Sequence, residues 1–259
     1  MISVIDYDYH IHANVLRIPD KAENYIKRAV EIGLREICIT DHAPYPHIKA
    51  GDRIPVGATK EYCARVRELS DKYSGQITVK CGMEIDYHPT LEGQIEEFLK
   101  DGDFDYVLGS SHLHIPNMLD VPMSELTTYE YAVLCFENNL KAVRSGYFDA
   151  IAHIDMYRWS TSIPGRFANG TEEVDVSRFE EIAREIFSEM EKRGVALEIN
   201  SHRMAPGNVE LVYPSAQLMD YAKDYALTYR FGSDAHSPDC VGHGREEVSQ
   251  SEIYKHCWR

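Results

Sequence analysis

Two histidines, His10 and His12, stand one residue apart in the stretch VIDYDYHIHANVLRIPD, which begins at Val4. The apolar run before them predicts a strand, and alternate residues of a strand point to the same side. Both imidazoles are therefore aimed at one point. Such a pair is either a surface accident or the start of a metal site, since imidazole is a common metal ligand.

Other side chains with metal-binding or acid–base chemistry recur along the chain, each at the end of a later apolar run. With His10 and His12, eight of the twelve histidines lie at the ends of apolar runs, a concentration that random placement would not produce. The groups are Asp41-His42, Glu84 in GMEIDY, His112 and His114 in GSSHLH, His153 and Asp155 in AHID, His202 and Arg203 in NSHR, and Asp234 and His236 in SDAH.

The elements that must position these residues follow a regular alternation. Helical patterns separate most of the apolar runs. Strands that alternate with helices pair in parallel, and barrel enzymes carry their chemistry at the carboxyl ends of the strands. We predict one α/β domain over residues 1–259, a closed or nearly closed (β/α) barrel. Its seven strands are expected at residues 3–9, 34–40, 77–85, 104–109, 148–152, 195–199 and 228–233.

Two segments show the helical pattern most clearly. AENYIKRAVEIG and RFEEIAREIFSEMEKRG each place apolar residues on one face and end at a glycine, Gly33 and Gly194, which is typical of a helix stop. The expected buried faces are Ala22, Tyr25, Ile26, Ala29 and Val30 in the first, and Phe179, Ile182, Ala183, Ile186, Phe187 and Met190 in the second.

Composition narrows the function classes. The net charge of −15 and the absence of a Lys/Arg cluster argue against nucleic acid and anionic membrane as partners. We find neither a signal-peptide pattern nor an apolar run of the ~20 residues that span a bilayer. The six cysteines are scattered without a CxxC pair, and Cys38 and Cys81 fall in strand-like runs as expected buried thiols. A reducing cytoplasm fits this pattern.

The ligand chemistry indicates a metal centre. Imidazoles and carboxylates without thiolates suit Zn, Mn or Fe, and more than four candidate ligands predict more than one divalent ion. Asp20 has a second interpretation, because an aspartate just before a helix is an ordinary N-cap. His47, His88, His243 and His256 lie outside the strand-end pattern.

The ordered series HxH, DH, GMExDY, GSxH, HxD and SDAH resembles the polymerase and histidinol phosphatase (PHP) superfamily, and within it the histidinol-phosphatase branch. The stretches ITDHAPYP, GMEIDYHP, FDYVLGSSHLH, AHIDMYRW, LEINSH and GSDAHSPDCVG carry the resemblance over nearly the whole chain. It implies a distorted (β/α)7 barrel, TIM-like, and a centre of two to three metal ions. The implied ligands are His10, His12, Glu84 and Asp234 for the first ion, Glu84, His112 and His153 for the second, and Asp20, His42 and His236 for the third.

The resemblance implies a phosphomonoesterase, most plainly one that hydrolyses L-histidinol phosphate by attack of a metal-bridging hydroxide. The proton donor is left open between Asp234, His236 and a metal-bound water. Arg158 and Arg203 follow strand ends and are candidate phosphate clamps, with a surface role equally open. Asp155 is a candidate partner for the substrate ammonium. Residues 43–58 and 155–175 are the expected specificity loops, and the second, by its length, is a candidate lid.

Several alternatives stay open. The substrate could be another small phosphorylated metabolite such as a sugar phosphate. An amidohydrolase shares the HxH motif, but no lysine stands at a strand end between Glu84 and His112 to bridge its metals. A nuclease of the same superfamily conflicts with the acidic charge. A non-catalytic metal-binding module would need neither three ions nor the arginines. The sequence does not indicate an oligomeric state.

Overall fold

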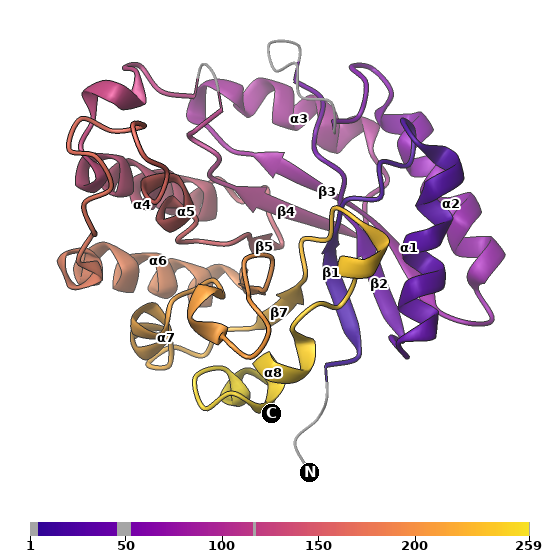
Figure 1. Cartoon of the computed structure of the whole chain (residues 1–259). Coiled ribbons are helices and arrows are strands. Elements are labelled where there is room, and N and C mark those ends of the chain that lie inside the picture. The colour runs from indigo at the N-terminus through magenta and orange to yellow at the C-terminus, as the bar shows by residue number, and fades with distance from the viewer. Residues whose placement is uncertain (1–4, 46–52, 116–117, 259) are drawn as a thin grey trace.

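Seven parallel strands pair in chain order in the computed structural model, which describes the chain apart from residues 1–4, 46–52, 116–117 and 259, and apart from the side chain of Asp20. This is the predicted strand number and order (Figure 1). The strands are β1 (Tyr7–Ile11), β2 (Glu36–Ile39), β3 (Thr78–Asp86), β4 (Tyr106–Ser110), β5 (Ala150–Ile151), β6 (Ala196–Asn200) and β7 (Tyr229–Gly232).

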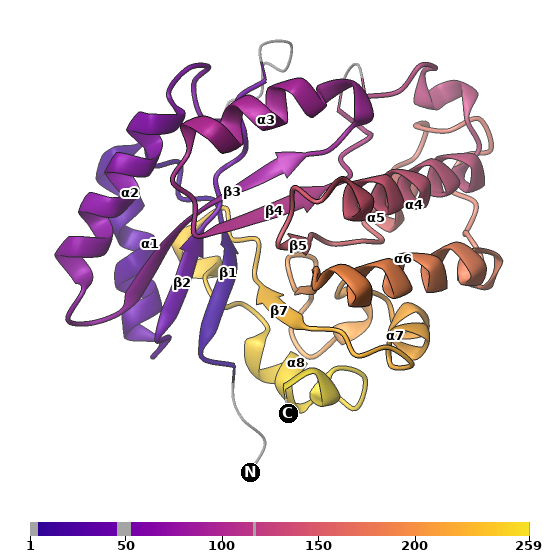
Figure 2. The ribbon, with the colours of Figure 1, turned by 180° about the vertical axis from the view of Figure 1, so that it is seen from behind.

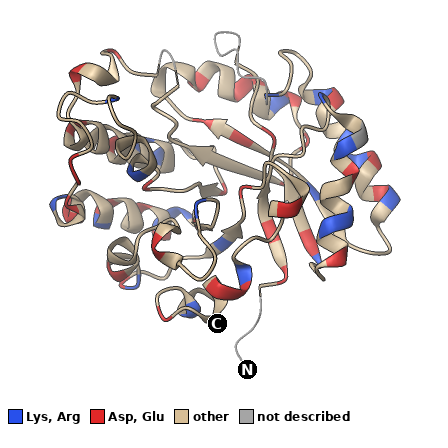
Figure 3. Ribbon diagram, viewed as in Figure 1, with Lys and Arg blue, Asp and Glu red and all other residues tan. Residues whose placement is uncertain are grey.

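Helices alternate with the strands and surround them on the outside (Figures 1 and 2). Acidic and basic residues are interspersed along these outer helices (Figure 3). None of the helices in the described residues is long and apolar enough to cross a membrane. Their bounds are α1 (Pro19–Glu31), α2 (Thr59–Tyr73), α3 (Glu92–Asp101), α4 (Thr128–Ser145), α5 (Tyr157–Thr161), α6 (Glu180–Arg193), α7 (Ala216–Ala222) and α8 (Arg245–Gln250).

The two helices expected from periodicity are confirmed as α1 and α6. Gly194 ends α6 in the left-handed region at φ 71°, where a residue with a Cβ is strained. Pro19 is the first residue of α1, the position that proline favours because its missing N–H would have no partner there. Ile18 therefore occupies the N-cap, and the interpretation of Asp20 as the N-cap is wrong by two positions.

The barrel closes between its first and last strands. Ile11 of β1 pairs with Ala235, which follows β7, and the main-chain N–H of His12 donates to the carbonyl of Ala235 at 2.9 Å. The buried carboxylate of Asp8 reinforces this seam, because it accepts the main-chain N–H groups of Ser233 and Gly242 at 2.9 Å each. The closure holds the HxH strand beside the loop after β7.

An inner cluster fills part of the barrel. Two tyrosines, Tyr9 and Tyr106, pack there with the smaller side chains of Cys38, Leu108, Ala150, Ala152 and Ala196, and most of the other buried apolar residues form a second, larger cluster. Cys38 and Cys81 are both fully buried, as the sequence predicts. The interior is therefore a packed core, and polar chemistry is confined to its ends.

Candidate metal centre

Glu84, near the end of β3, lies at the centre of a group of imidazoles and is 1% exposed. A carboxylate with two oxygens can serve two cations at once. Its Oε2 lies 2.8 Å from Nδ1 of His42 and 3.4 Å from Nε2 of both His10 and His12, and its Oε1 lies 3.2 Å from Nε2 of His153 and 3.6 Å from Nε2 of His112.

The HxH pair of β1 points into this group, as the strand spacing predicts. The Nε2 atoms of His10 and His12 lie 3.1 Å apart, and both side chains are fully buried. Asp234, which follows β7, brings its Oδ1 to 3.2 Å from Nε2 of His12. The barrel seam thus places the first and last strands at one cluster of nitrogen and oxygen atoms.

A second pair of imidazoles faces Glu84 from the loops after β4 and β5. The Nε2 atoms of His112 and His153 are 3.3 Å apart. Nδ1 of His112 lies 2.6 Å from Oδ1 of Asp86, and Asp86 in turn forms a 2.5 Å ion pair with Arg53. Since Asp86 only accepts when ionised, the hydrogen of His112 is on Nδ1 and its Nε2 lone pair faces His153.

His12, His42 and His236 form a third convergence. The ring of His12 lies 4.2 Å from that of His42 and 4.3 Å from that of His236, measured between centroids. One ligand atom from each of the three lies within 4.8 Å of the others. The backbone of Asp20 lies in the first turn of α1, but its side chain is outside the described residues, so its role as a ligand stays a prediction.

The cluster strongly perturbs the acidity of its members. Burial opposes ionisation of Glu84, but the imidazoles of His42, His112 and His10 outweigh it and hold the pKa of Glu84 well below its usual range. For Asp234, His10 and His12 have the same effect on the pKa. Both carboxylates are therefore anionic at neutral pH, which is the state that binds cations.

Two of these residues adopt backbone conformations that side chains rarely take. His153 has φ 23° and Asp234 has φ 52°. A non-glycine residue in this region costs on the order of 1–3 kcal/mol and persists only where its surroundings hold it, typically at functional sites. The strain coincides with the two loops that deliver ligands after β5 and β7.

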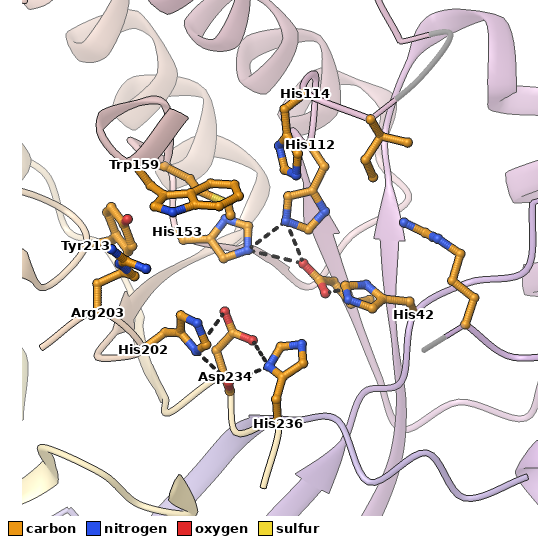
Figure 4. Close-up of a pocket in the computed structure, with 14 residues that line it drawn as sticks. His42, His112, His114, His153, Trp159, His202, Arg203, Tyr213, Asp234 and His236 are labelled. Atoms are coloured by element: carbon orange, nitrogen blue, oxygen red, sulfur yellow. Dashed lines mark hydrogen bonds and ion pairs between the residues drawn. The ribbon is translucent and has the colours of Figure 1, made fainter. Parts of the chain in front are cut away.

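A cavity of about 320 Å³ opens over the cluster. Arg203, His114 and His202 line it together with Arg53 from the predicted loop 43–58. Ile115, Met156, Trp159 and Tyr213 give the cavity an apolar wall, so the predicted loop 155–175 borders the cavity as expected. Figure 4 shows Trp159 and Tyr213 on the side of His153, and His202 and His236 on either side of Asp234.

Arg158 and Asp155 do not line this cavity. Their side chains bind each other at 2.8 Å, because a spacing of three residues at the start of α5 brings them face to face. Arg158 also donates to the carbonyls of Glu210 and Val212, and Asp155 accepts the N–H of Ser215. The expectation that Arg158 binds phosphate and that Asp155 pairs with the substrate ammonium is therefore wrong. Both charged side chains instead bind each other and neighbouring loops.

Sequence reasoning assigned no role to four residues around the cluster. Glu198 and Asn200 of β6 contact the ligand candidates, and Asp86 and Arg53 form the ion pair behind His112. A signal existed for three of them. MEID and LEIN each carry two polar residues at alternate positions of an apolar strand, the pattern of one strand face turned toward a polar partner.

Comparisons with known proteins agree with this geometry. The PHP domain model matches residues 8–202. The chain is 29% identical over 242 residues to the "Probable histidinol-phosphatase" of Deinococcus radiodurans, covering 91% of this chain and 88% of the relative. It is 25% identical over 250 residues to the histidinol-phosphatase of Lactococcus lactis, covering 90% and 84%.

A solved structure shares the fold. It is the histidinol phosphate phosphatase of Lactococcus lactis complexed with zinc, L-histidinol and phosphate, with a TM-score of 0.75, 21% identity, and coverage of 98% of this chain and 94% of that one. The family model matches well over half of the chain, which shows that the chain belongs to the PHP domain family.

Proposed function

We propose that this chain is a metal-dependent phosphomonoesterase that hydrolyses L-histidinol phosphate to L-histidinol and phosphate. The observation that carries the proposal is the convergence of five imidazoles on one buried carboxylate, Glu84, at the floor of a cavity. The names of the relatives supply the substrate, and the neighbouring structure holds both products.

The donor atoms fit metal ions. In His10 and His112 a carboxylate lies 2.6 Å from Nδ1, so in the neutral ring that binds a cation Nε2 presents a lone pair toward a second Nε2 at 3.1 or 3.3 Å. Two facing imidazole nitrogens are satisfied together by a cation between them. The same contact occurs twice, and an all-nitrogen and oxygen set suits zinc, manganese or iron.

We assign the ligands to two or three ions, with zinc as the first candidate because the neighbouring structure contains it. His10, His12, Glu84 and Asp234 would hold the first, and Glu84, His112 and His153 the second. His42 and His236 would hold the third with Asp20. Bound divalent ions would neutralise the phosphate charge and acidify water near neutral pH.

The remaining side chains bind and orient the substrate. Arg203 lines the cavity, and its planar guanidinium can bind two phosphate oxygens. His236, which lines the cavity, is the candidate for delivering a proton to the leaving alkoxide, whereas Asp234 is anionic at neutral pH and has no proton to give. The apolar wall around Trp159 offers an aromatic face to an imidazole, which a sugar phosphate could not use as well.

A phosphate-release screen tests this function. The purified protein is assayed with histidinol phosphate, several sugar phosphates and a phosphodiester, with and without a chelator. We expect histidinol phosphate to turn over at least ~100-fold faster than the others, which is ~2.7 kcal/mol of transition-state discrimination, and the chelator to abolish turnover. Equal rates on sugar phosphates would refute the substrate but keep the monoesterase. Cleavage of the diester alone would refute both.

A further inference from the structure

Glu198 of β6 stands outside the proposed ligand sets, yet it contacts both halves of the centre. Its Oε1 lies 2.6 Å from Nδ1 of His10, and its Oε2 accepts the main-chain N–H of His153 at 2.7 Å. The residue is 1% exposed. One carboxylate thus uses one oxygen for a residue of the first cation position and the other oxygen for a residue of the second.

The contact with His10 sets which nitrogen of that ring can bind a cation. A carboxylate only accepts, so in the neutral ring that binds a cation the hydrogen is on Nδ1 and Nε2 is left for coordination. That Nε2 lies 3.1 Å from His12, 3.4 Å from Glu84 and 3.7 Å from Asp234. Glu198 therefore turns the ligand atom of His10 toward the other members of the first position.

The contact with His153 acts on the backbone. His153 has φ 23°, a conformation that costs free energy and needs support from its neighbours. The hydrogen bond from its N–H to Glu198 is buried and supplies that support. If the bond is lost, the backbone can relax and carry the imidazole away from His112 and Glu84.

Asp86, which contacts His112 as Glu198 contacts His10, differs from Glu198 in its charge balance. Its charge is balanced by Arg53 at 2.5 Å. Within the described ranges, no lysine or arginine forms an ion pair with Glu198, whose other side-chain donor is Nδ2 of Asn200 at 3.1 Å. The negative charge of Glu198 therefore adds to the attraction of the centre for cations.

We infer that Glu198 is a positioning residue that couples the first and second cation positions, by fixing the His10 ring and the His153 backbone together. The inference rests on the metal centre of the proposed function and not on its substrate. Loss of the carboxylate weakens both positions at once, whereas loss of a single ligand would act first on its own position.

The experiment compares zinc binding by the wild type, Glu198→Gln and Tyr106→Phe. Gln keeps the size of the side chain but can accept only one of the two hydrogen bonds. Tyr106 is the matched control, because it is buried in the inner cluster and its hydroxyl has no hydrogen-bond partner among the described residues. Zinc affinity is measured by competition with a chelator, and bound zinc by elemental analysis.

We expect Glu198→Gln to lose two zinc equivalents together, with affinity lowered 10- to 100-fold at both positions, and Tyr106→Phe to bind zinc like the wild type. Loss of one equivalent, or none, in Glu198→Gln overturns the coupling. A wild type that binds no zinc overturns the metal centre as well. If circular dichroism shows Glu198→Gln unfolded, Glu198→Asp replaces it; the shorter side chain reaches only one donor, and unchanged zinc binding would then refute the inference.

Discussion

The two ends of the barrel both carry polar side chains, but they pair them differently. Toward the amino ends of the strands, the Lys80 ammonium donates to the hydroxyl of Tyr9 at 2.6 Å and forms an ion pair with Glu36 at 3.0 Å, and Tyr9 also contacts Glu36. At the carboxyl ends, imidazole nitrogens face one another around buried carboxylates. The first network is complete without a ligand, whereas the second becomes complete with cations.

The largest effect is expected where the carboxyl-end network loses a ligand. His12→Ala removes a nitrogen that lies near both Glu84 and Asp234, so zinc content falls and phosphate release stops. Elemental analysis and the phosphate-release assay measure the two effects, and circular dichroism is expected to show an intact fold. Full activity in His12→Ala would contradict the proposal that the carboxyl-end network needs bound cations and so differs from the amino-end network.

The second largest effect is expected at one of two arginines, Arg203, which lines the cavity, whereas Arg158 does not. Arg203→Met removes the guanidinium that lines the cavity and is expected to raise the KM about 10- to 100-fold, since a charged hydrogen bond contributes about 1.5–3 kcal/mol. Arg158→Met is the matched control. It breaks the contacts with Asp155 and two carbonyls, so it should lower the melting temperature and leave the KM near the wild-type value. The opposite pattern would restore Arg158 as the clamp.

The ion pair behind His112 predicts a pH dependence. Burial would raise the pKa of Asp86, but Arg53 and His112 outweigh it and lower that pKa below its usual value. The stabilisation is therefore present above about pH 4 and is lost as the pH falls further. In metal-free protein, Asp86→Asn should lower the free energy of unfolding by about 3 kcal/mol at pH 7. Urea unfolding should show this gap shrinking at pH 3, and a gap independent of pH would exclude the ionic origin.

The smallest effect is expected at the amino end. Lys80→Met breaks a partly exposed ion pair and should change the free energy of unfolding by no more than about 1 kcal/mol. Zinc content and turnover should match the wild type. Loss of zinc in this variant would mean that the two networks are linked through the core, and that the amino-end network is not independent of the metal centre.

Much of the fold was predictable because hydrophobic alternation marks buried parallel strands. The first and last residues of each strand were harder to predict. The first strand was expected at residues 3–9 but runs from Tyr7 to Ile11, and β5 has only two residues instead of the expected five because its ladder with β4 is that short. Where a strand ends depends on its neighbours, which local pattern does not contain.

The site divides in a similar way. Motif residues such as His10 and Glu84 converge as expected, because the strand ends of a barrel face a common axis. The role of Arg158 was not predictable, and for Glu198 the alternation in LEIN marks a polar strand face without naming its partner. For Arg158 the outcome depends on the start of α5, and for Glu198 on which face of β6 turns inward.

The seam between β1 and the loop after β7 has a consequence for how the protein is made. His12 leaves the ribosome long before its partner Asp234 and before Ala235, which bridges to Ile11. Contacts so distant in sequence form late in folding, because the long loop between them must close first. The nascent chain therefore cannot assemble the first cation position until β7 and the loop after it have emerged, which ties acquisition of metal to the synthesis of that segment.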